Sequence, residues 1–372
     1  MPREIITSLP DSRIVKTYRY RVKDKHAARL DRMARAVSFV WNFCNETQRT
    51  AVQRGNQWPS HFDLARLTAG TSKDLGLLAV TIDSVCSQYV VSRRTARRRM
   101  LRFRGKRSLG WVPFRSAGAR HIGQSFRFAG AEFGLWMHRA LPEGAKVRDG
   151  SSFSCDARRR WYLNLVVELP RPAARAIAGA VGVDLGLKSI VTVSNGDVVA
   201  APQHYRSSGR KLAVAQRARK RRLVRTVTAK IGAQRRDFLH KLSTRLVGEH
   251  GAIYVGDVSS VRLAKTRFAK SVLDAGWSSL RMMLRYKSDY AGIVYREVNE
   301  MGSTVTCSDC GSVGGPKGRE GLVVREWTCG GCGVVHDRDV NAARNILRFG
   351  CEAPTGARPA RVGRHHKLKE GR

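Results

Sequence analysis

The sequence predicts a chain of two parts, an α+β N-terminal part followed by an α/β C-terminal part. Before residue 170 the hydrophobic pattern alternates like a strand, then repeats with helical spacing, then alternates again. A Pro- and Ala-rich stretch, PRPAARAIAGA at 170–180, interrupts the pattern as a linker would. After it, apolar runs and helical segments take turns, which is typical of an α/β domain. We therefore place the main domain boundary between residues 170 and 171.

The N-terminal part, residues 1–170, combines one helical segment with two β-rich segments. RIVKTYRYRV at 13–22 alternates polar and apolar residues, which predicts a strand with one solvated face. A helical segment is expected over about 26–115, where its first helix buries an apolar stripe and exposes arginines. Residues 120–170 are expected to form strands, and the longest of these contains WYLNLVVEL.

The C-terminal part, residues 171–350, contains short apolar runs that alternate with helical patterns. Asn195-Gly196 is a turn signal of the kind that joins two hairpin strands. Strands are expected within 180–200, at 252–255 and at 292–298, and helices at 209–248, 272–289 and 336–350. The basic tail at 351–372 is expected to be disordered.

The charge balance predicts a polyanionic partner. The chain of 372 residues carries 69 Lys and Arg against 29 acidic residues, a formal net charge of +40. Repulsion of that size within one chain indicates that it binds a polyanion. A membrane surface is disfavoured because no apolar run approaches the roughly 20 residues of a spanning helix. The N-terminus also lacks the apolar segment of a secretory signal. Nucleic acid is therefore the predicted partner.

One dense basic run is predicted to contact nucleic acid directly. SRRTARRRMLRFRGKR at 92–107 places aromatic Phe103 among many arginines, with Trp111 and Phe114 following. Cations suit phosphates and aromatic rings suit stacked bases, although such a run could also be a solvated face. The candidate contact residues are Arg93, Arg94, Arg97, Arg98, Arg102 and Arg104.

Four of the eight cysteines form two close pairs. They are Cys307, Cys310, Cys329 and Cys332, two Cys-x2-Cys knuckles separated by 18 intervening residues. Four thiolates at this spacing predict a tetrahedral, structural zinc site, and Gly311 and Gly333 suit the knuckle turns. We assign a zinc ribbon to residues 303–336. The other four cysteines are scattered, so a reducing cytosol is more consistent than a disulfide framework.

Two aspartates occupy positions in the sequence that a bound cation would explain. Asp184 lies in the apolar run VGVDLGLKS, and burying a carboxylate there is unfavourable unless a cation compensates it. Asp339 begins the last helix in DRDVNAARN. An aspartate at a strand end or a helix N-cap needs no function, so each position alone leaves a structural role open.

The order GVDLGLK…IYVGDVSS…TCSDC…WTCGGCGVVHDRDVNAARNIL resembles the TnpB family. These are insertion-sequence-encoded RNA-guided nucleases related to type V CRISPR effectors. The resemblance is dense from about residue 180 to 350 and looser before residue 170.

The resemblance implies a fold, two partners and a catalytic metal. It implies a RuvC-like, RNase-H-type nuclease domain with the zinc ribbon inserted. It also implies an N-terminal lobe with a helical recognition part and a wedge-like β-barrel that holds a guide RNA. Asp184 matches the first acidic residue of the RuvC site and Asp339 the third, in a site that uses two Mg²⁺ ions. The implied target is double-stranded DNA in the bacterial cytoplasm, near the nucleoid, without a need for protein oligomers.

The middle acidic motif departs from the family pattern, since Gly256-Asp257 stands where Glu-Asp is usual. Asp257 is a poor substitute because neighbouring side chains on a strand point to opposite faces. The strands at 252–255 and 292–298 are expected to run parallel and side by side. We therefore predict that Glu300, just past the second strand, is the third metal ligand, with Glu297 as the weaker candidate. Glu300 could instead pair with an arginine.

Three functions follow from these patterns. The first is an RNA-guided DNA endonuclease with a rearranged acidic triad of Asp184, Glu300 and Asp339. The second is a nuclease-inactive RNA-guided DNA binder that acts like a repressor. A transposase acting without RNA is the third, but no Tyr nucleophile motif or other transposase triad stands out in the sequence.

Overall fold

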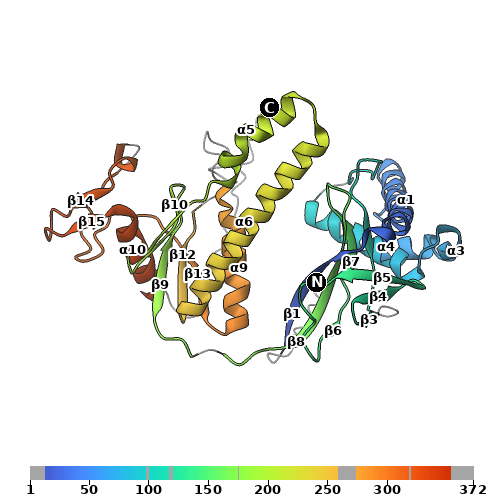
Figure 1. The fold of residues 1–372 in the computed structure, drawn as a ribbon, viewed down its shortest axis with the longest axis horizontal. Helices are drawn as coiled ribbons and strands as arrows, with labels where there is room; N and C mark the ends of the chain where they lie inside the picture. The colour runs from blue at the N-terminus through green and yellow to red at the C-terminus, as the bar shows by residue number, and fades with distance from the viewer. Residues whose placement is uncertain are drawn as a thin grey trace. The chain divides into compact units, whose positions relative to one another are not determined.

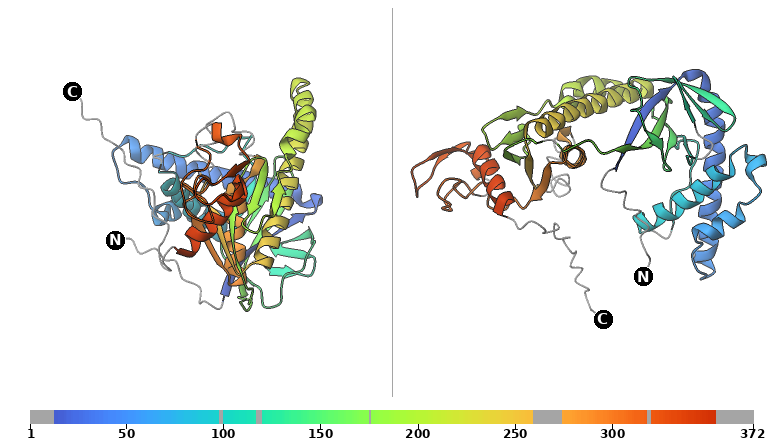
Figure 2. Two further views of the ribbon diagram at one scale, coloured as in Figure 1. Left: turned by 90° about the vertical axis from the view of Figure 1, so that its left-hand side faces the viewer. Right: turned by 90° about the horizontal axis from the view of Figure 1, so that it is seen from below.

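The computed structural model describes residues 13–97, 100–116, 120–174, 176–258, 274–317 and 320–352. The chain divides into two compact units, residues 1–171 and 172–372 (Figures 1 and 2). Residue 98 and the tail beyond residue 352, two places where the sequence made predictions, lie outside the described residues.

The first unit combines helices with one antiparallel sheet. Its helices are η1 (Asp24–His26), α1 (Ala27–Gln53), α2 (His61–Leu67), α3 (Ser72–Leu75) and α4 (Ala79–Ala96). Its strands are β1 (Arg13–Val22), β2 (Trp111–Pro113), β3 (Arg120–Ile122), β4 (Ser125–Phe128), β5 (Ala131–Trp136), β6 (Lys146–Val147), β7 (Ser152–Cys155) and β8 (Trp161–Pro170). The strand order is β2-β7-β8-β1-β5-β4-β3, with β6 paired to β8. The expected wedge-like barrel stays a prediction.

Two cores hold this unit together. The alternating residues of β1 and β8 pair antiparallel from Arg13 and Pro170 to Arg21 and Tyr162. One face of this sheet buries a group of phenylalanines, namely Phe114, Phe126, Phe128, Phe133 and Phe153. The predicted apolar stripe of α1 is buried at Leu30, Met33, Ala34, Val37, Val40 and Cys44.

The second unit is built on a five-stranded sheet. Its strands are β9 (Ala180–Asp184), β10 (Ser189–Val193), β11 (Val198–Ala200), β12 (Ala252–Gly256) and β13 (Val294–Val298), in the order β11-β10-β9-β12-β13. β12 pairs in parallel with both β9 and β13, whereas β10 and β11 run antiparallel to their neighbours. The predicted parallel pairing of the strands at 252–255 and 292–298 is confirmed. The carboxyl ends of β9, β12 and β13 therefore meet at one edge.

Helices cover both faces of this sheet. They are α5 (His204–Arg217), α6 (Arg221–Glu249), α9 (Trp277–Ala291) and α10 (Arg338–Glu352). A short η2 (Glu320–Leu322) and the hairpin β14 (Glu326–Thr328) and β15 (Val335–Asp337) belong to the cysteine segment. The pattern at 209–248 predicted continuous helix, but the structure breaks it at 218–220 and forms the antiparallel pair α5 and α6 (Figure 1).

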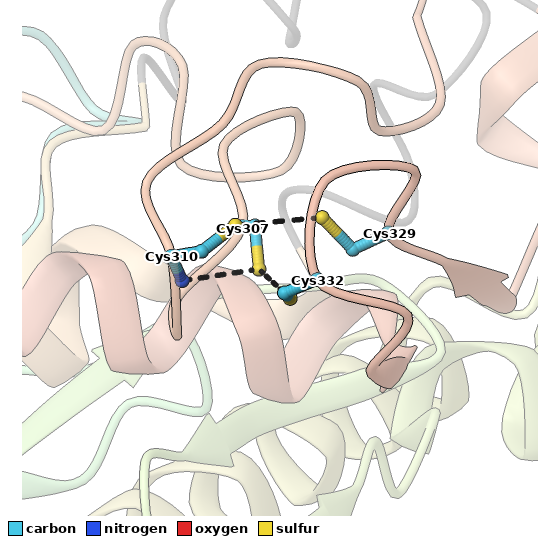
Figure 3. A group of neighbouring side chains, drawn as sticks. All are labelled: Cys307, Cys310, Cys329 and Cys332. Atoms are coloured by element: carbon cyan, nitrogen blue, oxygen red, sulfur yellow. Dashed lines mark hydrogen bonds between the residues drawn. The ribbon is translucent and has the colours of Figure 1, made fainter.

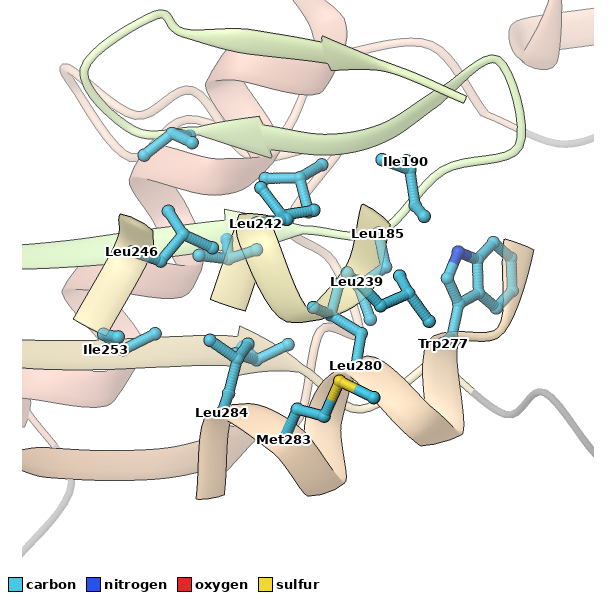
Figure 4. Close-up of a cluster of buried hydrophobic side chains, with 14 of the residues drawn as sticks. Leu185, Ile190, Leu239, Leu242, Leu246, Ile253, Trp277, Leu280, Met283 and Leu284 are labelled. Carbon is cyan, nitrogen blue, oxygen red and sulfur yellow. The ribbon is translucent and has the colours of Figure 1, made fainter. Parts of the chain in front are cut away.

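The two faces are separated by the alternation of side chains along the strands. Val181, Val183, Ile253 and Val255 pack with leucines of α6 and α9 in one core, part of which Figure 4 shows. Residues between them point to the opposite face, where α10 lies. Gly182 is the contact point, because a Cβ on it would lie 2.0 Å from the carbonyl oxygen of Ala343 in α10.

Among the described residues, no helix combines the length and the apolar character that crossing a membrane requires.

The contact at Gly182 gives a stability prediction. Gly182→Ala should lower the free energy of unfolding by about 1–3 kcal/mol or more, because the added methyl overlaps the backbone of α10. Gly232→Ala is the control, since nothing lies within 4 Å of a Cβ at that helical position. That variant should be neutral or stabilised by up to about 1 kcal/mol. Equal thermal unfolding midpoints for the two variants would contradict the packing described for α10.

Candidate functional site

Asp184 ends β9 on the face of the sheet that α10 covers. It lies two residues beyond Gly182, and period-two alternation places both side chains on the same face. Burial first, and then the negative charges of Glu300 and Asp339, raise the pKa of Asp184 to about 7. Arg338 and a hydrogen bond from the N–H of Leu185 offset part of this shift. Glu300 and Asp339 are thus each close enough to Asp184 to disfavour its charged form.

Glu300 takes the space that a side chain at position 256 would need. A Cβ built on Gly256 would lie 2.4 Å from Oε2 of Glu300 and 3.4 Å from its Cβ. Ile253 and Val255 belong to the core on the α6 and α9 side of the sheet. Because side chains alternate along a strand, Gly256 lies on the other face, the one that Asp184 shares. The carboxylate of Glu300 therefore stands where the side chain of residue 256 would enter the site.

Asp257 is hydrogen-bonded to the backbone of Glu300. The N–H of Glu300 donates to Oδ1 of Asp257 at 3.3 Å, and the N–H of Asp257 donates to the carbonyl of Val298 at 2.9 Å. Burial first, and then the negative charge of Asp257, raise the pKa of Glu300 to about 7. Arg281 and the N–H of Val258 act in the opposite direction. Asp257 thus contributes to the position and charge of Glu300.

Glu297, the weaker candidate, faces the other side of the sheet. Its carboxylate lies 2.5 Å from the guanidinium of Arg285 and 3.7 Å from that of Arg281, both on α9. The hydroxyl of Tyr295 lies 3.1 Å from the same carboxylate. These contacts hold Glu297 on the α9 face, away from Asp184.

Asp339 lies in the first turn of α10 but does not cap it. Oδ1 of Asp337 accepts the N–H groups of Asp339 and Val340 at 3.0 and 2.8 Å, so Asp337 is the capping residue. This corrects the N-cap assignment considered for Asp339. The Asp339 carboxylate is instead paired with Arg325, whose Nη1 lies 3.0 Å from Oδ2.

The chemistry of this donor set fits a hard divalent cation. Carboxylate oxygens are the ligands that Mg²⁺ prefers, and a cation would offset both the burial and the neighbouring negative charges that raise the pKa of Asp184. Among the described residues, two groups of ligand atoms lie within 4.8 Å of one another, the four paired cysteines and the set Cys307, Asp309 and His336, and neither includes the acidic triad. A site of two ions about 3.5–4 Å apart does not need its carboxylates to meet at one point.

The four paired cysteines form a separate cluster (Figure 3). Their ligand atoms lie within 4.8 Å of one another, with sulfur–sulfur distances of 3.7 Å for Cys307–Cys332 and 3.6 Å for Cys310–Cys329. Gly311 and Gly333 have φ of 78° and 76°, and each closes its knuckle with a backbone hydrogen bond. The predicted knuckle turns are confirmed, and the cluster could hold a metal ion.

His336 is a neighbour of this cluster that the cysteine pattern did not reveal. Its Nε2 lies 3.0 Å from the sulfur of Cys307, and its ring packs on Trp327 with centroids 4.9 Å apart. The imidazole is buried, at 3% exposed, and stands in β15 directly before the capping Asp337. The cysteine cluster is therefore connected through β15 to the start of α10.

The structure separates the predicted basic contact residues into two groups. Arg94, Arg97 and Arg102 are exposed, and Phe103 beside them is 49% exposed. Arg93 is only 5% exposed and donates hydrogen bonds to Gln48 and to the carbonyl of Pro59. This placement favours a structural role for Arg93 within the first unit. Arg98 lies outside the described residues.

Arg104 is half-buried between two tryptophans. Its guanidinium lies 5.9 Å from the ring of Trp41 and 6.0 Å from that of Trp111, and it donates to the carbonyl of Leu109 at 2.6 Å. These three side chains help to line a cavity of about 550 Å³. A planar cation between aromatic rings is a surface on which bases can stack.

Comparison with known proteins finds relatives that are named as RNA-guided DNA endonucleases. Residues 164–267 match a family described as “Probable transposase”, and residues 277–346 match the “Cas12f1-like, TNB domain” family. A Streptomyces pristinaespiralis protein named “Putative RNA-guided DNA endonuclease” is 35% identical over 92% of both chains. The “Putative RNA-guided DNA endonuclease InsQ” of Escherichia coli is 26% identical over 51% of this chain and 54% of its own.

The fold has a similar solved structure. A Cas12f1 chain, solved in a complex with sgRNA and target DNA, aligns with a TM-score of 0.61 at 11% sequence identity. The alignment covers 90% of this chain and 99% of that one. The likeness shows that the two chains share a fold of mixed α and β architecture. The chain is a member of the TnpB family.

The cysteine cluster gives a prediction of metal content. Purified protein should contain about one zinc per chain, and the double variant Cys307→Ser, Cys310→Ser should lose it, because two thiolate ligands are removed. Elemental analysis of dialysed protein measures this. Cys351→Ser, at an exposed cysteine outside the cluster, should retain the metal. Folded wild type without zinc would contradict the assignment.

The raised pKa of Asp184 gives a prediction of pH dependence. Without divalent cations the folded protein holds a proton on Asp184 that the unfolded chain releases near pH 4. This contribution therefore makes stability fall as pH rises from about 4 to about 7. Asp184→Asn should flatten the fall in unfolding midpoint, and Mg²⁺ should stabilise wild type more than the variant above about pH 7. Parallel pH profiles, with equal gains from Mg²⁺, would contradict this view of the site.

Proposed function

We propose that this protein is an RNA-guided DNA endonuclease whose α/β unit is a RuvC-like nuclease domain with a rearranged acidic triad. The triad is Asp184, Glu300 and Asp339. The observation that carries the proposal is the overlap between the Glu300 carboxylate and the space of a side chain at position 256. The glutamate that relatives place at the end of β12 would here be supplied from the end of β13.

The sheet supports this assignment because it brings three chain segments to one edge. Asp184 ends the central strand β9, Glu300 follows β13 by two residues, and Asp339 starts the helix that packs on β9. The pKa of Asp184 responds to both other carboxylates. An acidic cluster that is repulsive by itself is suited to hold cations.

The chemistry would be hydrolysis of a phosphodiester bond in target DNA. When bound, two Mg²⁺ ions would supply an activated water and neutralise the charge on the leaving oxygen. Asp184, Glu300 and Asp339 would hold these ions, and Asp257 would orient Glu300 through its backbone N–H. Arg325 adds a positive charge at the same edge through its contact with Asp339.

The first unit would hold the guide RNA and contribute to binding double-stranded DNA. The exposed Arg94, Arg97 and Arg102, with Phe103 beside them, offer phosphate and base contacts. The cysteine cluster would hold zinc in a structural role. We place the complex in the bacterial cytoplasm, at the nucleoid where its target lies, and expect one protein chain to be sufficient.

Gly256 favours a second candidate, a nuclease-inactive RNA-guided DNA binder. Gly256 stands where the family pattern implies a glutamate, so cleavage would depend on Glu300. The two candidates predict the same RNA and DNA binding but opposite results in a cleavage assay.

Cleavage by the RNA-bound protein tests the triad directly. With target DNA and Mg²⁺, wild type should cut, whereas Glu300→Gln should bind DNA equally well and lose cleavage. The metals supply several kcal/mol of transition-state stabilisation. Losing a ligand should therefore cost about 100-fold or more in rate. Glu297→Gln, on the opposite face, is the matched control and should keep cutting.

A second variant tests the relocation itself. Gly256→Glu with Glu300→Ala returns the carboxylate to β12 and removes the overlap with the Glu300 carboxylate, leaving Cδ1 of Ile346 at 3.1 Å from the new Cβ, so it should recover cleavage above the level of Glu300→Ala alone. Undiminished cutting by Glu300→Gln would reject the relocated triad. Absence of cutting by the wild-type complex, with intact target binding, would instead support the inactive binder.

A further inference from the structure

Two buried asparagines of α10 hold the chain segment that follows Glu300. Asn341 and Asn345 lie one helical turn apart on this helix and are 1% and 0% exposed. Both side chains donate to the same pair of backbone carbonyls, those of Ser303 and Thr306. These carbonyls lie between the end of β13 and the first cysteine knuckle. We call this contact the asparagine clamp.

The donors and acceptors of the clamp match one for one. Nδ2 of Asn341 lies 3.1 Å from the carbonyl oxygen of Ser303 and 2.8 Å from that of Thr306. Nδ2 of Asn345 lies 2.9 and 2.6 Å from the same two oxygens. Each amide nitrogen has two N–H groups, and each carbonyl oxygen has two lone pairs. Loss of either side chain therefore leaves one acceptor site empty on both carbonyls.

The clamp is connected to Glu300 through the backbone. The N–H of Ser303 donates to the carbonyl of Glu300 at 3.0 Å, while the carbonyl of Ser303 is held by the clamp. Asp257 provides the other backbone contact of Glu300, at 3.3 Å from its N–H. Residues 299–305 belong to no helix or strand. These contacts, rather than a regular ladder, therefore determine where the backbone of Glu300 lies.

The helix that carries the clamp also carries Asp339, in its first turn. The N–H of Ser308 in the first cysteine knuckle donates to Oδ1 of Asn341 at 2.8 Å, so the knuckle is tied to the same helix. The segment after Glu300 is thus fixed on a regular element that bears another carboxylate of the proposed triad.

Anchoring of the cysteine segment alone does not account for the clamp. Oδ1 of Asn345 is buried and has no hydrogen-bond partner among the residues that the structure describes. A buried acceptor without a partner is unfavourable, so this side chain stabilises the fold less than a fully paired one would. What the position supplies is the geometry that its two N–H donors impose on the carbonyls of Ser303 and Thr306.

We propose that Asn341 and Asn345 are positioning residues that set the carboxylate of Glu300 relative to Asp339. The inference rests on the proposed function, in which Glu300 is a metal ligand supplied from an irregular segment. A metal ligand must be held within narrow limits, and the residues around it provide this support. At position 256 the ladder of β12 would provide it, whereas the relocated glutamate depends on the clamp.

Single variants with a matched control test the clamp. Asn345→Ala removes two of its four donors, and Asn341→Ser is used in its place if that protein does not fold. Asn45→Ala is the control, because Asn45 is 0% exposed and donates to the carbonyl of Leu101 at 2.8 Å within the first unit. Each full-length protein is purified with its RNA. Zinc content and the thermal unfolding midpoint establish that it is folded under the assay conditions.

The first readout is binding of Mn²⁺, used as a probe for Mg²⁺ and measured by electron paramagnetic resonance. A protein with Asp184→Asn and Asp339→Asn gives the binding due to RNA, which is subtracted. Asn345→Ala should weaken the remaining binding about tenfold, and Asn45→Ala should leave it within about twofold of wild type. In a Glu300→Gln background Asn345→Ala should cause no further loss, because a positioning residue acts only through the group that it positions.

Equal losses in the wild-type and Glu300→Gln backgrounds would overturn the positioning role, as would equal effects of Asn345→Ala and Asn45→Ala. The second readout, hydrogen–deuterium exchange of peptides covering 299–306, needs no metal. Asn345→Ala should lose protection in these peptides, and unchanged protection would overturn the clamp. Absence of Mn²⁺ binding beyond that of RNA in the wild type would refute the proposed metal site instead. The exchange measurement would then still decide whether the clamp holds Glu300.

Discussion

The approach of α10 to β9 decides where the acidic residues of this protein can meet. Gly182 lets the backbone of the helix lie directly on the strand, since any Cβ there would overlap the Ala343 carbonyl. The first turn of the helix thereby comes next to the end of the strand, and Asp339 acts on the pKa of Asp184. Glu300 joins them because the parallel pairing of β12 with β13 brings it to the same edge.

Much of this arrangement could be predicted from local patterns. Alternation of polar and apolar residues indicates which face of a strand is buried, so the chain itself shows that Gly256, not Asp257, shares a face with Asp184. The same rule explains why Glu297 turns toward α9. The spacing of the cysteines indicates their cluster because two tight knuckles with glycines can present four thiols to one point.

Other features depend on contacts that no local pattern contains. Arg93 looks like its exposed neighbours in the basic run, yet packing of α4 against the segment at Pro59 buries it. The break between α5 and α6 lacks a Gly or Pro signal and follows from the packing of Leu212 on Val227 and Ile231. No local sequence pattern connects Arg325 with Asp339. The pairing of β14 with β15 brings their side chains together.

The overlap between positions 256 and 300 constrains how the residues at these two positions can be substituted during evolution. A glutamate at both positions would place two side chains in one space, since even a Cβ at 256 lies 2.4 Å from the present carboxylate. One of the two would have to turn away. An exchange between the positions could pass through that crowded form, or through a form with only two converging acids. Such a form would retain its charge and its hold on nucleic acid, so selection could preserve it as a binder until the third acid returned from the neighbouring strand.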